Sequence, residues 1–525
     1  MIMDFKLSSV PPLYTDLARS LGGEIDTSYH TIEEHSLDSS PCKINPHIVV
    51  YPKTVDDIKK VLSKADEYRI PVSVRGNGRN ASGATLVEGI VINMTKYFNH
   101  IRQVDMLGNV ISVDPGVSCK KIREHLGGWG AEIPYLTSQN DNDTIGGVVA
   151  TKNVSPTSFE HGGIASSVIG LSIVLSNGEH HTLEDGITPS GKLLSIYQAL
   201  FPLLSEEVHN LRGGKPLCAE DNSGYNLWGQ SIGPRQLINN IIGSQGTLAI
   251  ITNIKLRIVP KAATRKTTLI RIPSYAQLPQ AVETCKEHGV DSLFAYDTIL
   301  ENLSKEYFPH DNDVVASDIP HVLTLIATHW GSSDKNLHEK QKRLVGALKL
   351  PEENITFIQN DHHLDVLTQS EHAHKLLSTY GGGSLFPALT GDGMLVPIEH
   401  LGDALTEVEA YHTEKRLIFC VTGNVGSGHF SVTTLIPKDP LVYSDIVTDA
   451  MEHNFAIVKK YKGCGSALSG DGMTGTPYLK VLYTPKIITI FSKIKEIWDP
   501  HDILNPGKKN HFDTSYIKQR IQTPQ

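Results

Sequence analysis

A short apolar strand that runs directly into a glycine-rich loop is the feature that most constrains the fold of this chain. Pro71-Val72-Ser73-Val74 has the pattern of a strand, and Arg75–Gly83 follows it with three Gly, two Asn and two Arg. Glycine lets backbone N–H groups approach a phosphate closely, and successive N–H groups form an anion-binding nest. Ala81 follows the Gly76-x-Gly78 pair and no amphipathic helix begins there, which excludes the nicotinamide-binding G-x-G-x-x-G. The loop is either a phosphate cradle or an ordinary turn.

The segments around this loop alternate between helical and strand-like patterns. Thr54 has the character of an N-cap with Asp57 three residues on, and apolar residues follow at helical spacing. Residues 90–92 and 110–113 are strand-like. Gly170–Gly178 ends in Asn-Gly, the strongest short hairpin signal in the chain. These patterns indicate a fold that mixes helices and strands.

The pattern changes after Pro260, and we place a domain boundary there. Thr484 before Pro485 is an N-cap followed by proline at the first helical position, and an apolar stripe ending at Trp498 follows. The elements predicted between these points are helices over 280–288, 336–348 and 401–411 and strands over 322–327 and 417–422.

Composition narrows the class of protein. The length of 525 residues predicts two or more domains, and the net charge of −9 argues against a nucleic-acid-binding protein. We find no signal peptide and no transmembrane segment, which predicts a soluble, cytoplasmic protein. Six scattered Cys suggest neither a disulfide framework nor a zinc site, and 24 His leave open a metal enzyme or a hydrated surface.

Three further glycine-containing segments accompany the first loop: Thr144–Ala150, Gly243–Thr252 and Asn505–Lys509. Together with the first loop, this ordered set resembles the flavoproteins of the vanillyl-alcohol oxidase and p-cresol methylhydroxylase type, in the D-lactate dehydrogenase/glycolate oxidase branch. The resemblance covers roughly residues 45–512. The other motifs that carry it are Asp114-Pro115-Gly116, Gly170–Gly178, Asn222–Leu227, Thr476–Leu479 and Asp499-Pro500.

The resemblance implies an α+β fold with a two-lobed FAD-binding domain and an α+β cap domain. The implied division is 1–44 N-terminal extension, 45–260 FAD-binding domain, 261–483 cap (FAD-linked oxidase C-terminal type), and 484–525 C-terminal segment returning to the FAD domain. The implied cofactor-binding residues are Arg75, Gly76, Asn77, Gly78, Arg79, Asn80, Gly83, Pro115, Gly116, Ser138, Thr144, Gly146, Gly147, Gly243, Gln245, Gly246, Ile250, Ile251 and Asn505.

Two departures from the family pattern concern the cofactor. Relatives that tether FAD covalently have a His directly after the second Gly of the first loop, where this chain has Arg79. We therefore expect non-covalent FAD. The usual Glu of the Gly-Ser-Glu-Gly-Thr-Leu motif is Gln245 here, which keeps the hydrogen-bonding shape without the charge.

The catalytic half of the pattern departs further. The family's metal-ligating and base His positions hold Asn424, Ser431 and Gly472 in this chain, and Asp471 remains as a carboxylate. Asn and Ser are poor zinc ligands, so we expect no metal. The family's substrate-binding Arg has no counterpart near residues 371–377, where His372 and His374 lie instead. Asp392 fits one half of the family's Asp-Asp pair.

The candidate catalytic residues are His429, Asp471, Asn424 and Tyr478. His429 is the imidazole inside the altered motif, and a neutral imidazole suits proton abstraction. The alternative is that His429 is a hydrogen-bonded loop residue in a site that has changed its role. Tyr478 and Asn505 fall in motifs that the family keeps near the flavin.

Two functions remain open. The first is an FAD-dependent oxidoreductase that oxidises a small 2-hydroxy acid such as D-lactate or glycolate and passes electrons to an external acceptor. The chain has no cysteine-rich extension after Lys509, so we expect that relay on a partner. The second is a flavin-binding subunit or pseudoenzyme that has lost the metal and His site.

Overall fold

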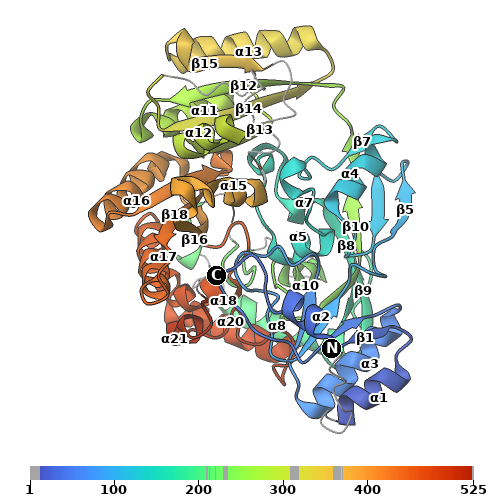
Figure 1. The fold of residues 1–525 in the computed structure, drawn as a ribbon. Helices are drawn as coiled ribbons and strands as arrows, with labels where there is room; N and C mark the ends of the chain where they lie inside the picture. The colour runs from blue at the N-terminus through green and yellow to red at the C-terminus, as the bar shows by residue number, and fades with distance from the viewer. Residues whose placement is uncertain are drawn as a thin grey trace.

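The computed structural model describes residues 12–207, 211, 213–218, 220, 222–228, 234–307, 319–358, 368 and 370–522. In Figure 1 two lobes built from the first half of the chain lie on the right, and a larger cap lies above and to the left. The red C-terminal helices run back beneath the cap, and the helix over 485–498 contacts the helix over 191–206. The architecture is therefore α+β, with two lobes and a cap.

The first lobe is a four-stranded sheet, and its edge strand β3, over residues 72–75, leads into the glycine-rich loop. Its order is β1-β2-β4-β3, with β4 parallel to both β2 and β3. Thr54 and Asp57 form the predicted capping box at the start of α3. The elements are α1 (Pro12–Ser20), β1 (Glu24–Asp26), α2 (Tyr29–His35), β2 (Ile48–Tyr51), α3 (Val55–Tyr68), β3 (Val72–Arg75) and β4 (Ile90–Asn93).

The second lobe is a five-stranded antiparallel sheet of order β5-β6-β10-β8-β9. The predicted hairpin is confirmed as β8 and β9, whose connection contains Gly178 at φ 85°. The strands are β5 (Ile101–Asp105), β6 (Val110–Val113), β8 (Val168–Val174), β9 (His180–Glu184) and β10 (Ile250–Arg257), with β7 (Ala131–Glu132) paired to β11 (Val259–Pro260). The helices are α4 (Cys119–Gly127), α5 (Ile145–Thr151), α6 (Ser158–His161), α7 (Ile164–Ser167), α8 (Gly191–Glu206) and α10 (Pro234–Ile241).

The cap is a seven-stranded antiparallel sheet of order β15-β12-β14-β13-β17-β18-β16. Its strands are β12 (Thr264–Ile272), β13 (Ser292–Asp297), β14 (Leu323–Gly331), β15 (Ile355–Ile358), β16 (Leu385–Leu395), β17 (Ile418–Gly423) and β18 (His429–Pro437). Its helices are α11 (Leu278–Glu287), α12 (Thr298–Tyr307), α13 (Asp334–Leu348), α15 (Ser370–Leu377), α16 (Leu401–Lys415) and α17 (Tyr443–Lys460). The helices and strands predicted after Pro260 are confirmed to within a few residues.

The C-terminal segment contains α18 (Gly472–Gly475), α19 (Leu479–Leu482), α20 (Pro485–Trp498) and α21 (Thr514–Lys518). The predicted apolar stripe of α20 is buried in one core with residues of the second lobe such as Tyr225 and Leu237. The domain bounds of the sequence analysis stay predictions, and this packing is compatible with them.

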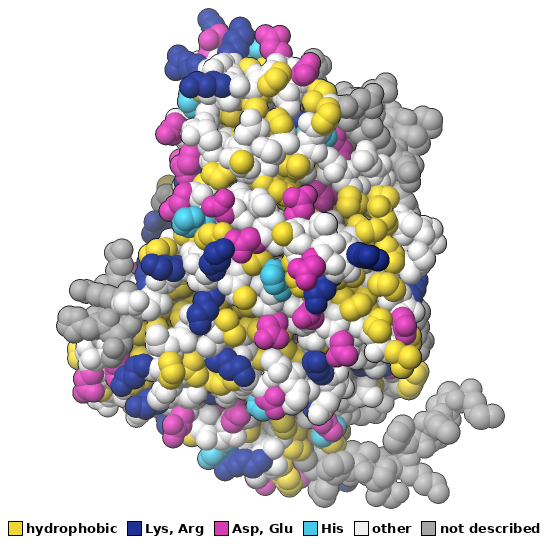
Figure 2. Space-filling model, turned by 90° about the vertical axis from the view of Figure 1, so that its left-hand side faces the viewer, with side chains coloured by type: hydrophobic (Ala, Val, Ile, Leu, Met, Phe, Trp, Pro, Cys, Tyr) yellow, Lys and Arg dark blue, Asp and Glu magenta, His cyan; other side chains and the backbone are white. Residues whose placement is uncertain are grey.

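The surface shows no segregation of charge on the face drawn in Figure 2, where basic and acidic side chains of the described residues are interspersed. In the part of the chain that the structure describes, no helix is long and apolar enough to span a bilayer.

Candidate cofactor and substrate site

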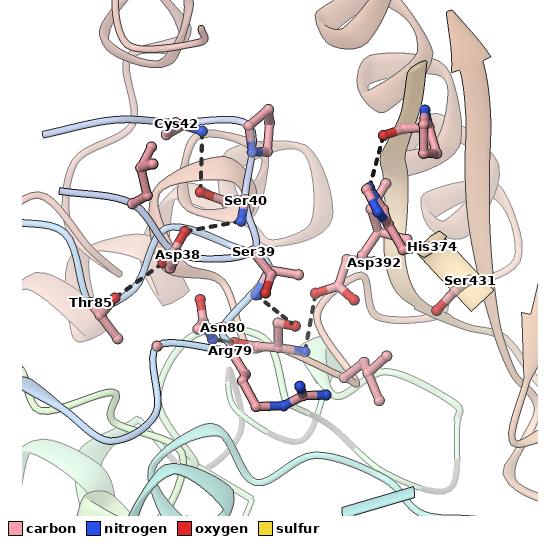
Figure 3. Close-up of a pocket in the computed structure, with 18 of the residues that line it drawn as sticks. Asp38, Ser39, Ser40, Cys42, Arg79, Asn80, Thr85, His374, Asp392 and Ser431 are labelled. Carbon is pink, nitrogen blue, oxygen red and sulfur yellow. Dashed lines mark hydrogen bonds between the residues drawn. The ribbon is translucent and has the colours of Figure 1, made fainter. Parts of the chain in front are cut away.

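A cavity of about 950 Å³ lies where the two lobes, the cap, the segment 33–43 and the C-terminal end of the described chain meet. Figure 3 shows loop residues Arg79 and Asn80 on one side and Asp392, His374 and Ser431 of the cap on the other. Ligand cavities typically measure about 300–1,000 Å³, so this one has room for a dinucleotide-sized group. The lining residues used below are Asp38, Gly76, Asn77, Gly78, Arg79, Asn80, Asp143, Thr144, Gly147, His374, Lys375, Asp392, Ser431 and Ser469.

The glycine-rich loop reaches the cavity only because it has no side chain at Gly76 and Gly78. A Cβ on Gly76 would lie 2.1 Å from Thr144 Oγ1, and Gly78 has a φ of +71°. Asn80 fixes the loop from within, since its Oδ1 accepts bonds from Ser82 N and Ala84 N at 2.9 and 3.0 Å. The loop is thus a preformed backbone cradle of the kind that binds phosphate.

Arg79 supplies a cation to this part of the wall. Its Nε lies 3.2 Å from Asp143 Oδ1, and its side chain is 13% exposed. Seven of the predicted cofactor-binding residues line the cavity: Gly76, Asn77, Gly78, Arg79, Asn80, Thr144 and Gly147. The cradle, its cation and the volume of the cavity together fit FAD.

Arg75, a predicted cofactor-binding residue, is not among the residues that line the cavity. Its guanidinium donates to Leu37 O at 2.6 Å and to Glu34 O at 3.2 Å, and it packs against Gly78 of the cradle from behind the lining residues. It thereby holds the segment 37–43, which itself lines the cavity. That segment also pairs with the C-terminal end of the described chain, through Lys43 N to Arg520 O and Gln522 N to Pro41 O. Sequence reasoning had assigned these residues no role.

Four of the other predicted cofactor residues, Pro115, Gly146, Gln245 and Asn505, contact lining residues or each other behind the wall. A Cβ on Gly146 would lie 2.6 Å from Pro115 Cβ, so these two residues pack directly on each other. Gln245 Nε2 donates to Ser469 O at 2.9 Å, and Gln245 Oε1 accepts from Gly472 N at 2.9 Å. Asn505 donates to Gln245 O at 2.7 Å. The remaining members outside the lining set are Gly83, Gly116, Ser138, Gly243, Gly246, Ile250 and Ile251.

His429 and Asn424 lie beneath the cavity wall. His429 Nδ1 accepts from Asn424 N at 2.9 Å, and Nε2 lies 3.3 Å from Ser431 Oγ. Burial lowers the pKa of His429 to about 3, so the ring is neutral with its proton on Nε2. Asn424 Nδ2 donates to Val154 O at 3.0 Å. In this arrangement the imidazole orients Ser431, which does line the cavity.

Asp471 and Tyr478 also lie off the wall. Asp471 Oδ2 is 2.6 Å from Lys509 Nζ, and both side chains are fully buried. Tyr478 stacks on Phe455 with ring centroids 4.5 Å apart, and burial raises the pKa of its hydroxyl. Both arrangements hold segments together. Among the described residues, no group of three His, Cys, Asp or Glu side chains could hold a metal ion.

Asp392 of the cap also lines the cavity, although the sequence did not predict it as a site residue. Its Oδ2 accepts from Ser469 N at 3.1 Å, while its Oδ1 has no hydrogen-bond partner among the described residues. Burial raises its pKa to about 6. His374 lies on the same wall with Nε2 at 3.2 Å from Pro387 O, and Lys375 follows it.

The fold and this cavity define a flavoprotein with two lobes and a cap. Residues 46–184 match the FAD binding domain, and residues 261–509 match the FAD linked oxidases, C-terminal domain. The chain belongs to the FAD-linked oxidoreductases, and its cofactor is FAD.

Curated relatives agree with this family. The chain is 23% identical to D-2-hydroxyglutarate dehydrogenase of Escherichia coli (strain K12), across 93% of this chain and 50% of that protein. It is 25% identical to glycolate oxidase subunit GlcD of Bacillus subtilis (strain 168), across 90% and 91%. The chain thus spans about half the length of D-2-hydroxyglutarate dehydrogenase and nearly all of the glycolate oxidase subunit.

Solved structures show the same fold. p-Cresol methylhydroxylase with substrate bound has a TM-score of 0.69 at 13% identity, across 95% of this chain and 97% of that one. Alkyldihydroxyacetonephosphate synthase has a TM-score of 0.65 at 15% identity, across 95% and 85%.

Proposed function

We propose that this protein is an FAD-dependent dehydrogenase that oxidises a small 2-hydroxy acid such as D-lactate or glycolate. The observation that carries the proposal is one cavity that joins a phosphate-binding loop to a cap wall bearing both a carboxylate, Asp392, and a cation, Lys375. The names of the relatives point to the same substrate class.

The chain's own residues divide the work between two parts of the cavity. Residues 76–80, Thr144 and Gly147 would hold the cofactor without a covalent bond, with Arg79 offsetting the phosphate charge. FAD, when bound, supplies the acceptor for the two electrons of the oxidation. An external acceptor in the cytoplasm would then take up these electrons.

Lys375 is the cation that we assign to the substrate carboxylate. Among the described residues of the cap, Lys375 is the one Lys or Arg that lines the cavity. It lies in the last turn of α15. The family's Arg in this region is missing, and a Lys ammonium can take over as a point charge. The side chain of His372 lies outside the described residues.

The competing function is a flavin-binding subunit that has lost alcohol oxidation. Its specific support is the absence of the expected His residues at 424, 431 and 472. Position 472 could not hold one in this conformation, because a Cβ on Gly472 would lie 2.2 Å from Ser82 O at a φ of +50°.

Anaerobic mixing of the purified holoprotein with D-lactate, L-lactate, glycolate and D-2-hydroxyglutarate separates these functions. The proposal expects the flavin absorbance to bleach with at least one of these acids, and Lys375→Met to raise the concentration needed for half-maximal bleaching. Lys375→Arg should retain most of the wild-type affinity. A yellow protein that none of the acids reduces would leave the competing function in place.

A further inference from the structure

Asp392 has a role that the family pattern does not predict. We propose that Asp392 is the catalytic residue that accepts the hydroxyl proton of the substrate, in place of the missing His residues. This inference rests on the proposed function, and it concerns the cap wall of the same cavity.

The backbone around Asp392 is built to bring this side chain to the wall. The pairing of β16 with β18 shifts register between Leu389 and Gly391 and again between Gly391 and Met394. Such irregularities re-aim a side chain out of the regular alternation of a strand. Gly393 at φ +74° lets the loop after α17 approach, since a Cβ there would lie 2.3 Å from Leu468 N. That close approach brings Ser469 N to Asp392 Oδ2.

The hydrogen bonding of Asp392 leaves it capacity to accept a proton. Oδ2 accepts one backbone N–H, from Ser469, and Oδ1 accepts none from the described residues. Buried polar atoms are normally hydrogen-bonded, so the buried Oδ1 without a partner among the described residues, in a ligand cavity, points to a functional position.

Neighbouring charged side chains do not set the pKa of Asp392. The titratable side chains that share the wall are His374, Lys375 and Tyr443 of the cap, Arg79 and Asp143 of the lobes, and Glu33, Asp38, Cys42 and Lys43 of the N-terminal segment. His429 of β18 lies beneath the wall and is neutral. The raised pKa of Asp392 comes from burial, opposed only by its bonds from Ser469. A base whose pKa lies near 6 is ionised at neutral pH and basic enough to accept a proton.

The reaction balances with this assignment. The O–H bond of the 2-hydroxy acid breaks and its proton bonds to Asp392, while the Cα–H bond breaks and its hydrogen leaves with both electrons to oxidised FAD. The product is the 2-oxo acid. Lys375 holds the carboxylate, so that the hydroxyl and not the carboxylate of the substrate meets Asp392.

The test compares Asp392→Asn with a matched control, Asp297→Asn. Asp297 is likewise a buried carboxylate with a pKa raised to about 6, but it accepts Leu300 N and Val421 N inside the cap core and lies off the cavity wall. Flavin reduction by the best substrate of the panel is measured from about pH 5 to about pH 9 for both variants. FAD affinity and melting temperature are measured in parallel.

We expect the wild-type rate to rise with pH through an apparent pKa near that of Asp392. Flavin reduction in Asp392→Asn should be at least about 100-fold slower and should no longer rise with pH, with FAD affinity retained. In Asp297→Asn the rate should still rise with pH as in the wild type. An Asp392→Asn protein that reduces at the wild-type rate with the same pH profile overturns the inference but not the proposed function. If the rise of the rate with pH is lost in His374→Gln and not in Asp392→Asn, then His374 is the proton acceptor, and this result also overturns the inference.

A direct readout covers the case in which Asp392→Asn does not fold. In wild-type protein labelled with carbon-13 at aspartate carboxyl groups, the resonances of Asp392 and Asp297 should both titrate near pH 6, and the Asp392 resonance should shift when the 2-oxo acid product binds. Asp297→Asn removes the Asp297 resonance, and Asp38→Asn and Asp143→Asn assign the resonances of the two other cavity aspartates whose pKa burial raises. Absence of a product-sensitive carboxyl overturns the inference, whereas a wild-type protein that no hydroxy acid reduces overturns the proposed function itself.

Discussion

Lys509 Nζ lies 2.6 Å from Asp471 Oδ2, and neither side chain is exposed to solvent. Asp471 also accepts from Gly224 N at 2.7 Å and from Ser466 Oγ at 2.5 Å, and Lys509 Nζ donates to Gly224 O at 2.6 Å. This pair therefore connects the second lobe, the cap and the C-terminal segment at one point beneath the cavity.

Removal of one partner of this pair should strongly destabilise the protein. Asp471→Asn leaves a buried ammonium without its counter-charge, which costs about 3–5 kcal/mol. Urea unfolding measures this loss, and the double variant with Lys509→Met should recover most of it. The exposed pair Lys518–Asp445 is the control, because Lys518→Met should cost less than about 1 kcal/mol. An equal loss in both variants would contradict this account.

Gly76→Ala should prevent FAD loading. The added Cβ would lie 2.1 Å from Thr144 Oγ1, so the cradle has to open before the methyl group fits. The ratio of FAD to protein in the purified variant measures the effect. Gly346→Ala is the matched control, because nothing lies within 4 Å of its new Cβ in α13, and it should load FAD as the wild type does. A fully loaded Gly76→Ala protein would rule out the cradle.

Arg75→Met should weaken FAD binding although Arg75 does not line the cavity. The two charge-assisted bonds to Leu37 O and Glu34 O hold segment 37–43, which lines the cavity. Loss of about 1.5 kcal/mol of this restraint corresponds to roughly a tenfold rise in Kd, measured by fluorescence titration with FAD. Unchanged affinity would show that the segment does not contribute to retention of FAD.

His429 should make the protein less stable in acid. Its folded pKa of about 3 lies below the ordinary value of 6.5, so the unfolded chain binds the extra proton between these limits. The contribution of His429 to the free energy of unfolding is complete above pH 6.5. It falls by up to about 1.4 kcal/mol per pH unit as the pH drops toward 3. The difference in unfolding free energy between wild type and His429→Gln should shrink over this range.

His429→Gln also tests the original expectation that His429 is the base. Since the ring lies beneath the wall with both nitrogens bonded, we expect flavin reduction within a few-fold of the wild-type rate. A loss as large as that expected for Asp392→Asn would restore His429 as the proton acceptor.

The sequence alone determined the elements and the cofactor class. The capping box at Thr54, the hairpin at Asn177-Gly178 and the helix after Pro485 were predictable, because turns, caps and helical spacing are set by residues a few positions apart. The glycine loops were predictable for the same reason, since close backbone approach excludes side chains locally. The missing His residues could be read directly from their motif positions.

The tertiary structure alone decided which side chains reach the cavity. Arg75 stands one residue from the cradle yet bonds to a segment 38 residues earlier, and Asn80 donates to Ser469, 389 residues later. Asp392 reaches the wall through two register shifts in β16 that no local pattern encodes. Burial and hydrogen-bond partners of this kind depend on how distant segments pack, and they determine the pKa of each group and therefore its chemistry.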